Sequence, residues 1–198
     1  VTFSVLSLNH PQNNQVILFS TPQIQKGLIY TLPISGLQDC YGITMKDTSI
    51  EFGIGKNPEA FEVVINEIYS IPDATISPSL PEIEFVEIYN TTNQLMSLNG
   101  LKFSDASTIE ILPDAVLQAK EYAILVKNSD SPDFLKYGKV VPLNNFPSLN
   151  NTGDILSLRN ADGKLIHQIS YLGDWFEDET KSNGGFTHWH QSIFNHFV

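Results

Sequence analysis

The chain has 198 residues, and 41% of them are hydrophobic, which is enough to build a buried core. Its formal net charge of −11 argues against nucleic acids and anionic membranes as partners, because both carry negative charge. No apolar run approaches the roughly 20 residues that cross a bilayer, so we expect no membrane insertion.

The first part of the chain, residues 1–57, contains four short stretches that are typical of β-strands. Turn-forming residues rich in Asn, Pro and Gly separate them, and no window repeats its apolar residues at helical spacing. This spacing predicts strands at 2–8, 15–19, 28–34 and 49–54.

The order of these parts resembles the C-terminal half of the bacterial Ig-like domains found in S-layer and other surface proteins. The resemblance rests on Phe19-Ser20, Pro22, residues 26–32, residues 34–39 and Gly42. A plain β meander is the alternative. Half a sandwich leaves apolar strand faces in water, which is unfavourable. We therefore expect this part to pack on the second domain or to self-associate with another copy.

A second domain is predicted at 61–198, after a short linker that ends at Pro58. It holds 8 basic and 18 acidic residues, so it carries most of the negative charge. Asp162-Gly163 predicts a type I′ hairpin turn, and Asn99-Gly100 predicts a second turn of the same chemistry. Strands are predicted at 63–69, 84–90, 100–104, 108–112, 121–127, 154–159 and 164–171, with one helical turn at 131–137.

These strands carry a second resemblance. Residues 64–68, 84–90 and 95–101 resemble the opening of a lamin-tail domain of bacterial type, and residues 147–158 resemble its Leu-Asn-x-x-Gly-Asp-x-Leu-x-Leu signature. The likeness covers residues 62 to about 190 and implies an all-β, Ig-like β-sandwich. It also implies a module of a larger bacterial protein that is secreted or attached to the cell surface. The family's closing Ser-Leu-Glu-Arg is missing after Gly184-Gly185.

Glu67 and Glu87 are the first candidate site, since they lie on strands expected to be neighbours. Strict alternation would place Ile65, Glu67 and Tyr69 on one face. Three roles are open to the two carboxylates. They accept hydrogen bonds from loop amides, hold a cation such as calcium with backbone carbonyls, or form an acid–base dyad. We favour the first.

Three other features were weighed as sites. The acidic run 174–179 lacks the spacing of a calcium loop and is interpreted as a solvated loop, with weak calcium binding as the alternative. His188 and His190 have the spacing of a zinc chelate on a strand, yet an exposed terminal segment is the simpler interpretation. Cys40, the single cysteine, has no histidine close to it in sequence, which argues against a nucleophile.

The sequence therefore predicts a non-catalytic structural or interaction module with no catalytic, metal-binding or cofactor-binding residues, calcium remaining possible. Its partners would be other proteins or neighbouring domains of the same polypeptide. The alternative function is that of an accessory module of a secreted nuclease or phosphatase whose catalytic domain lies elsewhere. We take the chain to be a piece of a longer protein, so the lack of a signal peptide says nothing about export.

Overall fold

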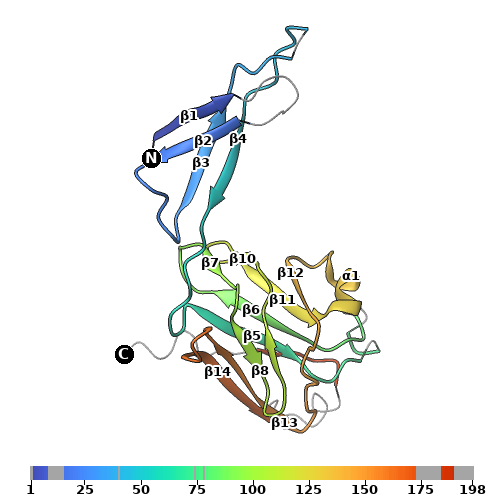
Figure 1. Cartoon of the computed structure of the whole chain (residues 1–198). Coiled ribbons are helices and arrows are strands. Elements are labelled where there is room, and N and C mark those ends of the chain that lie inside the picture. The colour runs from blue at the N-terminus through green and yellow to red at the C-terminus, as the bar shows by residue number, and fades with distance from the viewer. Residues whose placement is uncertain are drawn as a thin grey trace. The chain divides into compact units, whose positions relative to one another are not determined.

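The computed structural model describes residues 2–8, 16–39, 41–73, 75–77, 79–172 and 184–189. The chain divides into two compact units, 1–56 and 57–198, which are described separately (Figure 1). Both are built from β-strands, so the all-β prediction is confirmed.

The first unit contains two antiparallel hairpins. One pairs β1 (Thr2–Leu8) with β2 (Val16–Thr21), and the other pairs β3 (Ile29–Ile34) with β4 (Thr48–Gly53). The four predicted strands are confirmed to within two residues. Side chains along β3 alternate between exposed and half-buried, as expected of a sheet covered on one face at most. Burial is described for residues 20–39 and 41–56 of this unit, and among these only Gly27 is buried.

The second unit is a sandwich of two main sheets (Figure 1). The first sheet has the order β12-β11-β6-β5-β15, with β12 (Val140–Leu143), β11 (Tyr122–Lys127), β6 (Phe85–Asn90), β5 (Val63–Tyr69) and β15 (His188–Trp189). The second has the order β14-β13-β8-β9, with β14 (Leu165–Leu172), β13 (Gly153–Arg159), β8 (Lys102–Ser104) and β9 (Ile109–Ile111). A small ladder joins β7 (Met96–Ser97) to β10 (Val116–Leu117).

The core lies between these two sheets. Strands β5, β6, β8, β11, β12, β13 and β14 supply apolar side chains that are almost completely buried, among them Ile65, Ile88, Phe103, Leu125 and Leu158. Burying a side chain of this size contributes about 1.5–3 kcal/mol. His167 adds a polar link across the sandwich, because its Nδ1 accepts a hydrogen bond of 3.1 Å from the Ile65 N–H.

Strand β12 was not predicted. It is four residues long and contains Pro142, which cannot donate to a ladder, so its sequence signal is weak. Its pairing with β11 is parallel, and the connection between them holds the 3₁₀ turn η1 (Asn128–Asp130) and the short helix α1 (Ser131–Phe134). The predicted helical turn at 131–137 is thus confirmed over its first half. Neither helix in the described part of the chain is long and apolar enough to cross a membrane.

Both predicted turns are present, but the type I′ geometry is wrong. Gly163 has a φ of 87°, whereas Asp162 does not have a positive φ. The Gly163 N–H instead closes a turn on the Asn160 carbonyl at 2.9 Å, which places the glycine at the fourth and last position of the turn. At Asn99-Gly100 the Leu101 N–H bonds the Leu98 carbonyl, and Gly100 alone has a positive φ, 76°. This is the pattern of a type II turn.

Candidate functional site

The outer face of the five-stranded sheet, the face turned away from the core, consists of two unlike halves. One half is apolar and is formed by Tyr69, Phe85, Ile124, Val126 and Phe134, with ring centroids 5.4 Å apart for Phe85 and Phe134. Helix α1 contributes Phe134, so this half has a cover. The other half has Glu67, Glu87, Tyr89 and Tyr122, which we call the Glu–Tyr surface.

A β-bulge in β5 creates the polar half. The pairing of β5 with β6 shifts between Ile65 and Glu67, so that Glu67 lies directly opposite Glu87. Ile65 and Ile68 both point into the core, and Asn66 reaches the outer face, where its Nδ2 donates to Glu87 Oε1 at 2.8 Å. The predicted alternation, with Ile65 and Glu67 on one face, is therefore wrong. The extra residue of the bulge breaks the period of two.

Glu87 is the more constrained of the two carboxylates. Burial raises its pKa, the hydrogen bond from Asn66 lowers it, and the negative charge of Glu67 raises it again. Desolvation penalises the charged form, and a like charge at a directly opposed position adds to the penalty. Glu67 and Glu87 thus lie on neighbouring strands, as predicted, and burial together with the opposed charge disfavours the ionised form of Glu87.

Tyr89 and Tyr122 complete the surface. They are paired across β6 and β11, and their rings stack with centroids 4.4 Å apart and planes 25° apart. Tyr122 is 47% exposed, so one part of its ring is open to solvent. Burial raises the pKa of Tyr122, followed by the effects of Tyr89 and of Glu87. The carboxylate of Glu87 is therefore close enough to the phenol to influence it.

Other glutamates bind the loop amides. Glu84 Oε2 accepts a bond of 3.2 Å from the Leu149 N–H, and Glu110 Oε1 accepts one of 3.0 Å from the Asn144 N–H. Glu87 takes its bond from a side-chain amide of the next strand. The favoured role was thus assigned to the wrong residues. Glu84 begins a predicted strand, and Glu110 lies between two isoleucines. Neither position in the sequence indicates that the side chain binds a loop amide.

The remaining sequence candidates fall partly outside the described residues. This applies to Cys40, to the run 174–179 and to His190. His188 and Trp189 form β15, which pairs antiparallel with β5, so their backbone belongs to the five-stranded sheet. The preceding Gly185 donates from its N–H to the Ile71 carbonyl at 2.8 Å and holds the segment in place.

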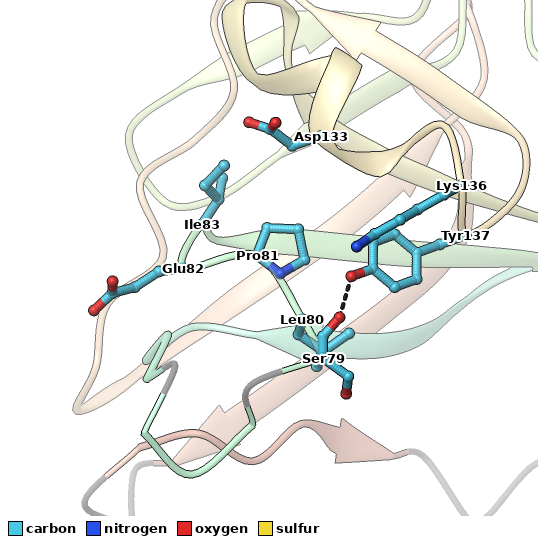
Figure 2. A pocket seen from close by; sticks show the side chains of 8 residues that line it. All are labelled: Ser79, Leu80, Pro81, Glu82, Ile83, Asp133, Lys136 and Tyr137. Atoms are coloured by element: carbon cyan, nitrogen blue, oxygen red, sulfur yellow. Dashed lines mark hydrogen bonds between the residues drawn. The ribbon is translucent and has the colours of Figure 1, made fainter.

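An open pocket of about 400 Å³ lies beside α1 (Figure 2). Its walls come from residues 79–83 and from Asp133, Lys136 and Tyr137. The Tyr137 hydroxyl donates to the Ser79 carbonyl, and Lys136 Nζ lies 4.8 Å from the Tyr137 ring centroid (Figure 2). The hydrogen bond joins the segment that follows α1 to the loop between β5 and β6. Over the described ranges, no three His, Cys, Asp or Glu side chains are grouped as metal ligands would be.

The family model of the Lamin Tail Domain matches residues 57–173. The chain belongs to the lamin tail domain family. The match falls on the second unit, from its first residue to just past β14, and therefore includes every strand of both main sheets except β15. No curated protein matches the chain.

Family membership sets the class of the second unit, the lamin tail unit. Lamin tail domains are Ig-like β-sandwiches, which confirms the predicted fold class, and they are non-catalytic interaction modules. The Glu–Tyr surface is the polar half of the outer sheet face, and Tyr122 is its exposed side chain.

Proposed function

We propose that this chain is a non-catalytic module for protein–protein contact, spacing or display in an exported or cell-surface multidomain protein of bacterial type. The observation that carries the proposal is the division of the outer sheet face. One half of this face packs against apolar side chains, so its residues have a structural role in the core. The Glu–Tyr surface instead leaves Tyr122 47% exposed, and it keeps two carboxylates opposed at a cost in stability. A costly exposed feature is typical of binding sites.

The first unit supports the same role. Its order of strands and turns resembles the C-terminal half of S-layer-type Ig-like domains, and a module of that type would continue a row of domains. Its exposed apolar side chains, which include Leu37, Ile43 and Ile50, would be covered by a neighbouring domain or by a second copy. Neighbouring domains of the same polypeptide and other proteins are the expected partners.

Two measurements test this proposal. Antibodies raised against the chain, applied to fractions of the cells that make it, should detect the protein in the envelope or the medium. Confinement to the cytoplasm would contradict the proposal. In the second measurement, the chain is photo-crosslinked from a benzophenone placed at Ser97, beside β10, or at Lys127, at the end of β11. Adducts with envelope proteins support protein contact.

The alternative of a hydrolase accessory module is tested by assays for nuclease and phosphoesterase activity. The purified chain should hydrolyse neither substrate. Hydrolysis that disappears in Glu67→Gln would overturn the non-catalytic assignment, because Glu67 and Glu87 form the carboxylate pair closest to an acid–base dyad.

A further inference from the structure

We propose that the Glu–Tyr surface binds an arginine side chain of a protein partner. The inference rests on the proposed function and names the chemistry of the partner. It is carried by the arrangement of two opposed carboxylates beside a stacked tyrosine pair, of which Tyr122 is 47% exposed.

The carboxylates supply the charge complementarity. Glu67 and Glu87 lie directly opposite each other, where side chains on one face are about 5 Å apart. The ion pairs Lys139–Glu121 at 3.2 Å and Lys164–Glu59 at 2.9 Å involve neither of them. A cation placed between the two carboxylates would remove their repulsion and compensate the partial burial of Glu87.

The tyrosines favour a planar cation over a compact one. A guanidinium can stack on the exposed part of the Tyr122 ring while its N–H groups point to a carboxylate, whereas an ammonium offers a point charge only. Fork-like hydrogen bonds from arginine to a carboxylate are stronger than neutral ones. The Nδ2 of Asn66 donates a hydrogen bond of 2.8 Å to Glu87 Oε1, so this carboxylate is already oriented.

The charge of the whole chain supports the same partner. With a net charge of −11, it attracts a basic segment over a distance and repels an acidic one. Calcium would take six to eight oxygen ligands, and the two side chains supply at most four oxygens. The surface thus matches an arginine presented by another protein better than it matches a bare metal ion.

The test is a titration followed by amide chemical shifts of the whole chain, with the peptide acetyl-Gly-Arg-Gly-amide as the probe. We expect saturable shifts confined to β5, β6 and β11 around the Glu–Tyr surface. The peptide with citrulline in place of arginine, which has the same shape without the charge, should cause none. Scattered shifts, or equal shifts with citrulline, would overturn the proposal.

The double variant Glu67→Gln/Glu87→Gln should raise the dissociation constant for the arginine peptide about tenfold. Glu82→Gln/Asp114→Asn is the matched control. It removes the same charge from two exposed side chains of the same unit, and binding should stay within about twofold of the original value. Equal losses in both double variants would mean that the net charge attracts the peptide, and the proposal would fail.

Tetramethylammonium separates the guanidinium from a quaternary ammonium ligand. If it binds as tightly as the arginine peptide, a simple cation site replaces the arginine site and the proposal is overturned. A negative titration together with positive cross-linking to envelope proteins would reject the arginine site and leave the interaction module standing. Hydrolytic activity of the chain, in contrast, would reject the proposed function itself.

Discussion

The two units of this chain contain similar strand sequences and yet differ in what those strands bury. In the lamin tail unit, β5, β6 and β11 each bury a row of apolar side chains against a second sheet. In the first unit, β3 and β4 pair with each other, and Ile29 and Ile50 remain 40% and 51% exposed. Alternation of apolar residues thus predicts a strand in both units, but it predicts a core only where a second layer is available.

The largest expected difference concerns the isoleucines of the two units. Ile65→Ala empties a fully buried position in β5 and should lower the free energy of unfolding by about 2–5 kcal/mol. Ile50→Ala, at an exposed position in β4, should change it by less than about 0.5 kcal/mol. Urea unfolding followed by circular dichroism measures both. Similar losses in the two variants would mean that Ile50 is buried in solution.

Two glycines extend the comparison to turns. Gly36 has a φ of 67° and open space around it, so Gly36→Ala should cost about 1–2 kcal/mol for backbone conformation alone. Gly153, with a φ of 131°, is the first residue of β13, and a Cβ there would lie 2.7 Å from the Tyr171 carbonyl oxygen. Gly153→Ala should therefore cost a further 1–3 kcal/mol or so for the clash. Thermal unfolding followed by calorimetry measures the difference, and equal costs would contradict it.

The raised pKa of Glu87 predicts a smaller change in folding stability, and this change depends on pH. Burial holds the pKa of Glu87 above its unfolded value, so the folded protein binds a proton more readily than the unfolded chain. The stability contributed by this group is full below the ordinary glutamate pKa and is lost as the pH rises through the raised pKa. At neutral pH, Glu87→Gln should stabilise the chain by roughly 0.5 kcal/mol, the scale of an interaction screened by solvent.

The pH profile checks the sign of this effect. Urea midpoints of Glu87→Gln and of the original chain should converge as the pH falls to about 4, where the original carboxyl is protonated. Glu51→Gln, at an exposed position in β4, removes one charge from the first unit and serves as the control. A neutral-pH loss of stability in Glu87→Gln would show that the Glu87 charge contributes favourably.

The smallest expected effect is that of calcium. Melting curves in EDTA and in millimolar calcium should coincide, because the Glu67–Glu87 pair provides too few oxygens for this ion. A rise in Tm with calcium that is absent in Glu67→Gln would locate calcium at the Glu–Tyr surface. A rise that persists in this variant would direct attention to the other acidic segments.

The sequence predicted the strands of the lamin tail unit well, and it predicted which face of them is buried less well. Ile109 and Ile111 would be assigned to the core by composition, yet they are 68% and 61% exposed, while Glu110 between them is 8% exposed. Glu110 reaches a loop amide at Asn144, a contact between residues far apart in the chain. Tertiary hydrogen bonds of this kind override a local pattern.

The same reason explains the partial success at the candidate site. The pairing of Glu67 with Glu87 follows from two adjacent strands, and it could be predicted. The bulge at Asn66 and the stacking of Tyr89 on Tyr122 depend on the register with β6 and β11, which no local spacing encodes. Two consecutive polar residues between two core isoleucines, as in Ile65-Asn66-Glu67-Ile68, break the period of two and would have indicated the bulge.

Native-state hydrogen exchange of the whole chain, read by mass spectrometry, tests the central contrast most directly. We predict that amides of β5, β6, β11 and β13 exchange only through global unfolding of the lamin tail unit, because both main sheets share one core. Amides of β3 and β4 should exchange orders of magnitude faster, as expected of a two-stranded sheet with exposed apolar side chains. Equal protection of the two units would contradict the account.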